Sequence, residues 1–291
     1  MKLGHLNTPD GPRLCVRDDE GRMIAAADLV PDAPATLDEL IRGDGQTWVS
    51  RLSEALATAS GVSPTEGPPA PALVSPSAIV AIGLNYLDHC REFGTKPPER
   101  PIVFAKLPVS LAADGEEIVW REDVTEAVDW EAELGVVIGE PTRDVPVEEA
   151  LDSVFGYTVV NDLTARDIQA EEQQWIRAKS LNGFCPLGPV VVTADEIPDP
   201  QRLRISSRVN GETMQESTTA EMIFTVAQLV SYLSRSFTLQ PGDVIATGTP
   251  VGVGGFREPP IYLADGDVVE VEVERIGVLR NRCRVLAAVN A

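Results

Sequence analysis

Short β-rich segments follow one another along most of the chain beyond residue 72, and this feature limits the available folds more than any other. Apolar and β-branched residues there are bounded by glycine, proline and aspartate, as is typical of strands and the turns between them. The predicted strands cover residues 79–82, 102–105, 128–138, 189–193, 203–209, 244–247 and 268–273. The dipeptide Asn210-Gly211 predicts a tight two-residue hairpin turn after the fifth of them.

Helices are few in the same region. The sequence predicts one that begins near Asn85, one over about residues 164–178 and one over about residues 221–234. Many short strands with few helices indicate an α+β fold that is mostly β, a mixed β-sandwich or rolled barrel and not a doubly wound parallel sheet. No Gly-x-Gly-x-x-Gly motif follows a strand and no phosphate loop is present, so the sequence gives no support for a nucleotide cofactor.

The first 72 residues have a different pattern, in which short apolar stretches mix with glycine and proline. Residues 13–17 and 22–26 predict a hairpin, and apolar residues at helical spacing predict a helix over about residues 48–59. The proline-rich stretch 67–71 excludes regular structure and indicates a linker. We therefore predict a small N-terminal α+β domain over residues 1–72 and a larger domain over residues 73–291.

Charge and composition exclude several classes of protein. The 291 residues include 24 basic and 45 acidic ones, and the resulting net charge of −21 repels phosphate backbones, so we predict no nucleic-acid partner. No apolar run approaches the roughly 20 residues of a membrane span, and the first residues lack the apolar core of a secretory signal. These features predict a cytoplasmic protein without membrane contact. Its four cysteines have no zinc-finger spacing and are predicted to be reduced packing residues.

Residues 128–138 are the most informative segment. Side chains alternate between the two faces of a strand, so Asp129, Glu131 and Glu133 project to one side and the apolar residues between them to the other. Carboxylates gathered on a buried strand repel one another and lose hydration, and they require a cation, an arginine or protonation. A hard divalent ion such as Mg²⁺ or Mn²⁺ fits this requirement. The alternative is a strand with one hydrated face.

Asp162 is a third candidate metal ligand, since it stands where a predicted strand ends and a helix begins. An aspartate at this place is usually an N-cap, but Thr164 and Asp167 resemble a capping box, which leaves Asp162 free to face the other carboxylates. A metal site requires the three side chains to meet at one point. Oxygens that point apart, or a lysine or arginine filling the gap between them, would contradict it.

His89 and Glu92 are candidate catalytic residues. They lie three positions apart on the predicted helix near Asn85 and therefore share a face. A carboxylate beside an imidazole raises its basicity and fixes its tautomer, which suits a general base that takes a proton from water. The alternative is an ordinary surface contact. Residues 94–98, which follow, are predicted to form a mobile cover over a site.

Six segments, taken in order, resemble the fumarylacetoacetate hydrolase superfamily, and the resemblance spans about residues 73–285. Two of them are Asp-Trp-Glu-Ala-Glu-Leu-Gly at 129–135 and Asn-Asp-Leu-Thr-Ala-Arg-Asp at 161–167. The full segments are residues 83–92, 101–106, 129–139, 156–169, 179–189 and 241–254. The resemblance implies a mixed β-sandwich roll, usually a homodimer, that binds Mg²⁺ or Mn²⁺ through Glu131, Glu133 and Asp162.

The resemblance also implies roles for further residues. Lys179 is expected to reach the bound substrate, and His89 and Glu92 correspond to a dyad on a closing lid. The residues expected to line the substrate pocket are Arg166, Gln169 and Thr249. Leu181-Asn182-Gly183, which follows Lys179-Ser180, departs from the commonest family pattern, Phe-Asp-Thr or Phe-Gly-Thr. If the usual hydroxyl contacts substrate, Gly183 removes that contact and enlarges the pocket.

The implied activity is metal-dependent chemistry on a small 2-oxo acid, whose carboxylate and keto oxygens would chelate the cation. Our first hypothesis is hydrolysis of the C–C bond of an acylpyruvate through a metal-stabilised pyruvate enolate, with water activated by the dyad. The alternatives are decarboxylation of oxaloacetate or a related β-keto diacid, and keto–enol isomerisation of a 2-hydroxymuconate-like diacid. A hypothesis of another class is a non-catalytic binding protein on an inherited fold.

Overall fold

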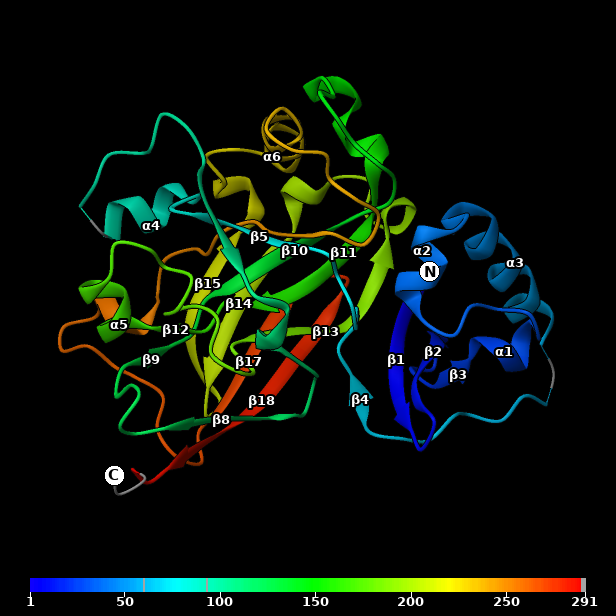
Figure 1. Cartoon of the computed structure of the whole chain (residues 1–291), viewed down its shortest axis with the longest axis horizontal. Coiled ribbons are helices and arrows are strands. Elements are labelled where there is room, and N and C mark those ends of the chain that lie inside the picture. Colours follow the sequence, from blue (N-terminus) through cyan, green and yellow to red (C-terminus); the bar gives the residue numbers. More distant parts are fainter. Residues whose placement is uncertain (60, 93, 289–291) are drawn as a thin grey trace.

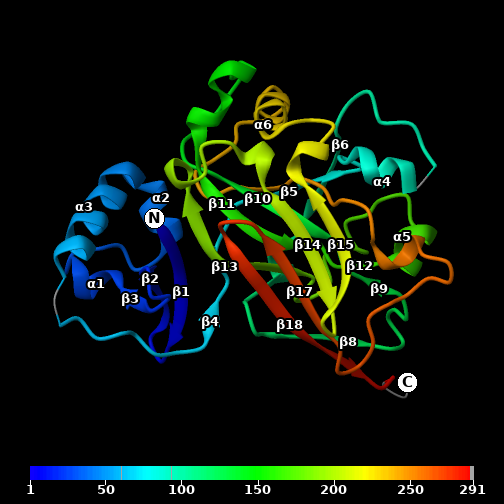
Figure 2. The same ribbon diagram turned by 180° about the vertical axis from the view of Figure 1, so that it is seen from behind.

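The structure, a computed structural model, describes residues 1–59, 61–92 and 94–288. Two β-sheets pack face to face in it (Figures 1 and 2). The strands of the larger sheet are β1 (Lys2–Thr8), β2 (Gly11–Arg17), β3 (Met23–Ala25), β4 (Pro69–Ala70), β5 (Ile79–Gly83), β6 (Ile102–Lys106), β7 (Leu111–Ala112), β10 (Ala132–Ile138), β11 (Val154–Asn161), β13 (Cys185–Thr193) and β16 (Val244–Ala246). Its order is β3-β2-β1-β13-β11-β10-β16-β5-β6, with β4 on β1 and β7 on β13.

The second sheet lies in front of the first in the view of Figure 2. Its order is β15-β14-β17-β18-β8, and a two-stranded pair, β9 and β12, stands apart. These strands are β8 (Glu117–Arg121), β9 (Val128–Asp129), β12 (Thr164–Ala165), β14 (Arg204–Val209), β15 (Glu212–Thr218), β17 (Val268–Val273) and β18 (Gly277–Leu286). Parallel pairs such as β5 with β16 occur beside antiparallel ones, so the predicted mixed, mostly β sandwich is confirmed.

Helices cover the edges of the sandwich. They are α1 (Ala26–Leu29), α2 (Leu37–Arg42), α3 (Gly45–Thr58), α4 (Leu87–Glu92), α5 (Arg166–Glu171) and α6 (Val226–Ser234). The short 3-10 turns are η1 (Pro108–Ser110), η2 (Val147–Ser153), η3 (Ala194–Glu196), η4 (Pro200–Arg202), η5 (Thr219–Glu221) and η6 (Gly254–Phe256). Helices α1, α2 and α3 lie at one side of the molecule, and α4 and α5 lie at the opposite side (Figures 1 and 2).

Strand β10 contributes to two hydrophobic cores because its side chains alternate. Leu134, Val136 and Ile138 pack with the second sheet and α6, whereas Val137 packs with the N-terminal helices. Burial of both faces explains the nearly continuous apolar sequence of this strand. It also places a glutamate at position 133 inside the protein rather than at a hydrated surface.

The N-terminal region agrees with prediction in its hairpin, β2 with β3, and in helix α3, which begins three residues earlier than expected. Two elements differ. The proline-rich stretch does contain regular structure, since β4 pairs with β1, and β1, which was not predicted, joins the region to β13. Pro69 can sit there because β4 is a two-residue strand at the sheet's margin. The domain boundary near residue 72 stays a prediction.

The predicted strand over residues 128–138 is interrupted between β9 and β10. The N–H of Trp130 donates to the side chain of Asp129 and that of Glu131 to the side chain of Asn161. The N–H of Ala132 donates to the side chain of Gln215. Three successive backbone N–H groups thus donate to side-chain oxygens, whereas in a regular sheet they would donate to backbone carbonyls.

The helix predicted over residues 164–178 is only α5, and the capping box is wrong. Its N-cap is Ala165, without a side-chain cap, while the Thr164 hydroxyl donates to the carbonyl of Asp162. The N–H of Ala165 donates to the carbonyl of Ala178 at 2.9 Å. This bond turns the chain back after α5 and brings Lys179 beside β12. The other two predicted helices also begin later, as α4 and α6.

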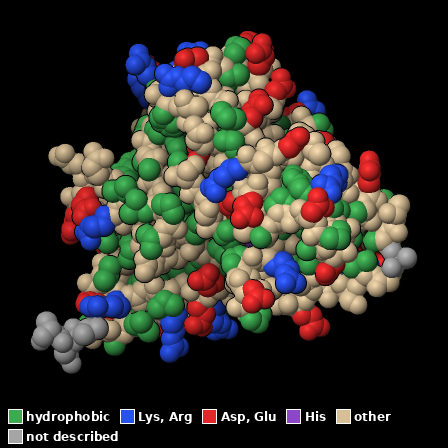
Figure 3. Space-filling model, turned by 45° about the vertical axis from the view of Figure 1, so that its right-hand side comes forward, with side chains coloured by type: hydrophobic (Ala, Val, Ile, Leu, Met, Phe, Trp, Pro, Cys, Tyr) green, Lys and Arg blue, Asp and Glu red, His purple; other side chains and the backbone are tan. Residues whose placement is uncertain are grey.

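The turn at Asn210-Gly211 joins β14 to β15, with φ of 52° and 82°. The four cysteines are buried and unbonded to one another. Among the described residues, no helix has the length and apolarity required to cross a membrane. Acidic and basic side chains are interspersed on the face shown in Figure 3.

His5 ties the N-terminal strands to helix α2. Its buried ring accepts a hydrogen bond at Nε2 from the N–H of Leu37, at 2.9 Å, so Nδ1 carries the hydrogen that is donated to the carbonyl of Pro71, at 3.1 Å. A second proton on Nε2 would place a donor against the Leu37 donor. Burial lowers the pKa of His5 below its ordinary value, and the neutral ring is the form that the fold stabilises.

We expect the protein to lose stability as the pH falls below about 6.5, because the unfolded chain then binds a proton that His5 excludes when folded. The free energy of unfolding by urea, measured at pH 7.5 and at pH 5.5, checks this. His5→Gln keeps a side-chain acceptor and should lose less stability than the wild type between these pH values. Equal losses in the two proteins would contradict the role given to His5.

Candidate active site

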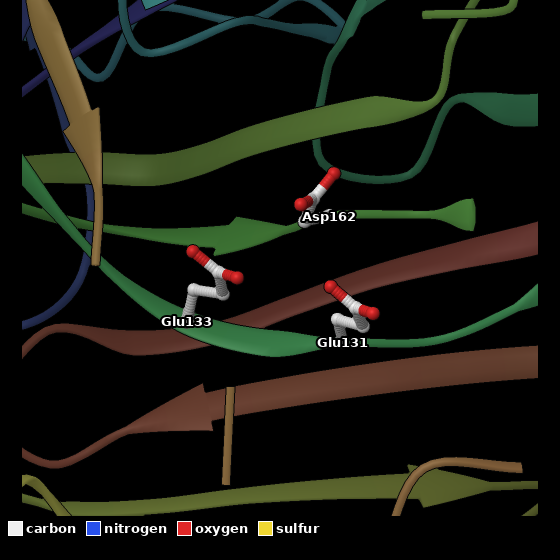
Figure 4. A group of neighbouring side chains, drawn as sticks. All are labelled: Glu131, Glu133 and Asp162. Carbon is white, nitrogen blue, oxygen red and sulfur yellow. The ribbon is translucent and has the colours of Figure 1, made fainter. Parts of the chain in front are cut away.

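Glu131, Glu133 and Asp162 meet inside the molecule. Each offers one carboxylate oxygen, and the three oxygens lie within 4.8 Å of one another. Figure 4 shows both glutamate side chains rising from the same side of their segment toward Asp162, which follows β11. The side chains are 6%, 1% and 0% exposed, respectively. A hydrogen bond from the N–H of Asp162 to the carbonyl of Glu131, at 3.0 Å, holds the two segments together.

Three cations surround this group, of which Lys106 and Lys179 are buried and Arg166 is partly buried. The Lys179 ammonium lies 2.7 Å from Glu131 and 2.8 Å from Asp162, and Lys106 forms a second ion pair with Asp162. The Arg166 guanidinium lies 2.7 Å from Glu131 and 2.7 Å from Asp129. The Lys179 ammonium therefore occupies the space between Glu131 and Asp162. The prediction that no lysine fills the space between the three carboxylates is wrong for this pair.

Glu133 is the carboxylate that these cations leave unmatched. Four buried carboxylates, counting Asp129, face three cations, and one negative charge is left over. Within the described residues, Glu133 accepts a hydrogen bond from the N–H of Gly248, at 2.9 Å, and forms no ion pair. Burial, together with the charges of Asp162 and Glu131, raises the pKa of Glu133 well above its ordinary value. The site thus requires one more positive charge, as a proton or a metal ion.

The neighbouring groups remain charged. Burial alone would raise the pKa of Glu131, but Lys179 and Arg166 lower it below its ordinary value. Burial would also lower the pKa of Lys179, whereas Asp162 and Glu131 raise it. Ionised carboxylates are the form that ligates a hard cation. The three carboxylates could hold a divalent ion, which would have to take the place that the Lys179 ammonium occupies between Glu131 and Asp162.

His89 and Glu92 form a hydrogen-bonded pair on α4. The distance from His89 Nδ1 to Glu92 Oε2 is 2.9 Å, and the other oxygen of Glu92 accepts a hydrogen bond from the N–H of Gly252, at 3.0 Å. His89 is 4% exposed, so the alternative of an ordinary surface contact is excluded. An ionised carboxylate accepts only, so Nδ1 carries the hydrogen and Nε2 is the basic nitrogen of the neutral ring.

One cavity, of about 430 Å³, brings the predicted residues together. Its polar lining consists of His89, Glu131, Glu133, Arg166, Gln169, Lys179 and Thr249. Asp162 and Glu92 stand behind this lining, each bonded to a residue in it. Arg166 and Gln169, which are bonded to each other at 2.9 Å, lie three apart on α5 as expected. The cavity combines acidic groups, a basic nitrogen and donors, which is a set for proton transfer.

Gly183 lies outside this cavity. A Cβ at that position would meet the side chain of Ile118, at 3.7 Å, and φ there is +78°. Gly183 is thus not among the residues that line the cavity, and the effect of the Leu181-Asn182-Gly183 pattern on substrate stays a prediction. Residues 94–98 are mostly exposed, and their mobility stays a prediction.

Sequence reasoning missed the residues that hold the site from behind. The buried amide of Gln215 donates to Thr249 Oγ1, at 2.8 Å, and accepts from the N–H of Ala132, at 3.0 Å. Lys106, at the end of a strand, is 2% exposed and reaches Asp162. A lysine that ends an apolar strand is a usable signal for a buried ion pair, whereas nothing near Gln215 in the sequence indicates its partners.

Gly248 is required by geometry. Its φ is +96°, and a Cβ would lie 2.8 Å from the Cβ of Asn85 and 3.1 Å from the carbonyl of Ile82. Only glycine fits both constraints. This close approach lets the N–H of Gly248 reach Glu133 and places Thr249 at the cavity.

Comparisons with known proteins agree with this architecture. Residues 78–284 match the family model described as fumarylacetoacetate (FAA) hydrolase C-terminal. The chain is 40% identical, over 97% of its length and 91% of the relative's, to the mitochondrial oxaloacetate tautomerase FAHD2A of Bos taurus. A fumarylacetoacetate hydrolase structure from Exiguobacterium antarcticum superposes with a TM-score of 0.84 and 36% identity, covering 98% of this chain and 100% of that one.

A third similar protein has been solved with ligands. It is the maleylpyruvate hydrolase of Sphingobium sp. SYK-6, in complex with manganese(II) and pyruvate, with a TM-score of 0.80 and 28% identity over 98% of this chain and 99% of that one. The fold and the cavity define a small-molecule enzyme with a candidate divalent-metal site. The chain belongs to the fumarylacetoacetate hydrolase family.

We expect Glu133→Gln to abolish stabilisation by metal without destabilising the metal-free protein. The glutamine keeps an acceptor for the N–H of Gly248 and removes the unmatched charge. In the wild type, a metal concentration 100 times the Kd should add about 2.7 kcal/mol to the free energy of unfolding. Thermal melts in EDTA and in MgCl₂ or MnCl₂ measure both effects.

The matched control is Glu140→Gln, because Glu140 is an exposed glutamate just beyond β10. It should retain the full metal-dependent shift in melting temperature. A Glu133→Gln protein that metal still stabilises as strongly as the wild type would refute the assignment of Glu133 as a ligand.

Proposed function

We propose that the protein catalyses keto–enol tautomerisation of a small 2-oxo acid, with oxaloacetate as the first substrate to test. The observation that carries the proposal is the His89–Glu92 pair, which faces the same cavity as the acidic group and Lys179. Its main support among relatives is the tautomerase that aligns over nearly the whole chain.

In the proposed tautomerisation, His89, Lys179 and Glu92 have different roles. His89 takes a proton from C3 of the substrate, the C3–H bond breaks, and its electrons form the C2=C3 double bond. Negative charge develops on the keto oxygen, where the Lys179 ammonium stabilises it. The protonated His89 then returns the proton to that oxygen, which completes the enol. Glu92 holds the imidazole in position through Nδ1 and stabilises its charged form.

A metal ion fits beside these residues. We propose that Glu131, Glu133 and Asp162 hold Mg²⁺ or Mn²⁺, which would supply Lewis-acid polarisation of the keto oxygen. Arg166 fixes Glu131 from the other side, and we assign Gln169 and Thr249 to substrate binding because their side chains line the cavity.

Hydrolysis of an acylpyruvate is the second candidate. The same pair can activate water in place of abstracting the C3 proton, and a maleylpyruvate hydrolase is among the similar structures. Three assays with added Mg²⁺ separate the reactions: loss of the ultraviolet absorbance of enol-oxaloacetate, pyruvate release from acetylpyruvate, and CO₂ release from oxaloacetate. Tautomerisation without the other two products supports our proposal, and no turnover in any assay refutes it.

We expect His89→Gln to lower kcat by about 10²–10⁴-fold, the usual contribution of a general base. Metal-dependent stabilisation should be retained, since His89 is not one of the proposed ligands. His5→Gln, the same substitution at the other histidine, is the control and should keep kcat. Stopped-flow absorbance of the enol measures both, and a His89→Gln enzyme with wild-type kcat would remove the dyad from the mechanism.

A homodimer is also proposed. Strand β6 is at the edge of the larger sheet, and Val103 on it and Leu107 and Val109 after it are 41%, 45% and 58% exposed. Apolar side chains along a sheet edge are typical of a surface that pairs with another chain. A cytoplasmic location stays a prediction, because the named relatives include a mitochondrial protein.

A further inference from the structure

Part of the cavity lining is apolar and is not used by the proposed chemistry. This part, the apolar end, is largely aromatic and consists of Ile82, Leu84, Phe104, Trp175 and Tyr262, whereas Phe256 lies against Arg166 and His89. A cavity of about 430 Å³ is within the range that binds drug-sized molecules. It therefore has more room than a four-carbon acid such as oxaloacetate requires.

Phe104 and Trp175 form the start of this apolar end. Their rings meet edge to face, with centroids 5.4 Å apart and planes inclined at 72°. The Lys179 ammonium lies 5.1 Å from the centre of the Phe104 ring, so these aromatic rings begin directly beside the charged groups. A substrate with its keto group near Lys179 would extend its next carbons along these rings.

Trp175 is held in place by an adjacent glycine. A Cβ at Gly83, the last residue of β5, would lie 2.7 Å from Cζ3 of Trp175. The indole thus packs directly on the backbone of a strand that ends at the cavity. Trp175 is half-buried, so one part of it is fixed by the strand and another remains available to a ligand.

Charge in the cavity argues against a second carboxylate at this end. The basic side chains of its described lining are Arg166, which is paired with buried Glu131, and Lys179 and His89, which are assigned to the keto oxygen and to the proton at C3. A distal carboxylate would therefore lose part of its hydration against these aromatic rings without a cation to pair with. A neutral apolar group would instead gain from leaving water.

We propose that this enzyme prefers 2-oxo acids with an apolar, preferably aromatic, group beyond C3 over 2-oxo diacids, and that Phe104 and Trp175 set this preference. The inference rests on the proposed tautomerisation and names the substrate class of the same site. A preference for substrates with a neutral tail distinguishes this inference from an activity directed chiefly at oxaloacetate.

The test compares two acids that enolise at C3, phenylpyruvate with an uncharged ring and oxaloacetate with a carboxylate. With added Mg²⁺, we expect kcat/KM for phenylpyruvate to exceed that for oxaloacetate by tenfold or more. Trp175→Ala should lower this ratio at least about tenfold, the scale of a lost hydrophobic contact in a specificity pocket. Trp175→Arg, which supplies a cation, should favour oxaloacetate further.

Trp48→Ala is the matched control, because Trp48 lies on helix α3 under Arg51, outside the cavity lining. It should leave the ratio at its wild-type value. Turnover of oxaloacetate with a ratio below one, or a ratio that neither Trp175 variant changes, would overturn this inference and leave the proposed function standing. Turnover of neither acid would overturn both.

Discussion

The unmatched negative charge of Glu133 is the constraint on which the site depends. A carboxylate that is 1% exposed, next to two others, cannot remain ionised in an apolar interior without a positive charge nearby. Lys106, Lys179 and Arg166 supply positive charge to its neighbours and none by direct contact to Glu133 itself. The protein therefore keeps a place for one more cation next to a cavity that admits small molecules. Folding alone gives no reason to retain such a group, since a neutral side chain would be less costly there.

The fold holds this unfavourable arrangement through hydrogen bonds between distant segments. Side chains of Asn161 and Gln215 take the N–H groups at Glu131 and Ala132, so the acidic segment leaves the regular ladder before β10 begins. Gln215 also holds Thr249. Three residues after Thr249, the N–H of Gly252 donates to the side chain of Glu92 and so fixes α4 to the same segment. The base and the acidic group are thus positioned by one connected network.

Local pattern was sufficient to predict part of this structure. The alternation along residues 129–133 correctly put Glu131 and Glu133 on one side, and the spacing of His89 and Glu92 correctly predicted their contact. Errors arose where distant contacts override local preference. The helix predicted over residues 164–178 stops at Glu171, where Glu172 takes an extended conformation, and the chain turns back so that Ala165 bonds to Ala178. This change is what delivers Lys179 to the carboxylates. The ion pair of Lys106 and the hydrogen bonds of Gln215 join segments far apart in the chain. The spacing of residues in the sequence therefore cannot predict these contacts.

A crystal structure of the protein grown with Mn²⁺, with an anomalous difference map that locates the manganese, tests the central claim most directly. The account predicts a manganese peak within about 2.5 Å of oxygens from Glu131, Glu133 and Asp162, with the Lys179 ammonium moved out from between Glu131 and Asp162. Manganese bound elsewhere, or a map in which Lys179 still bridges those two carboxylates at saturating metal, would contradict it.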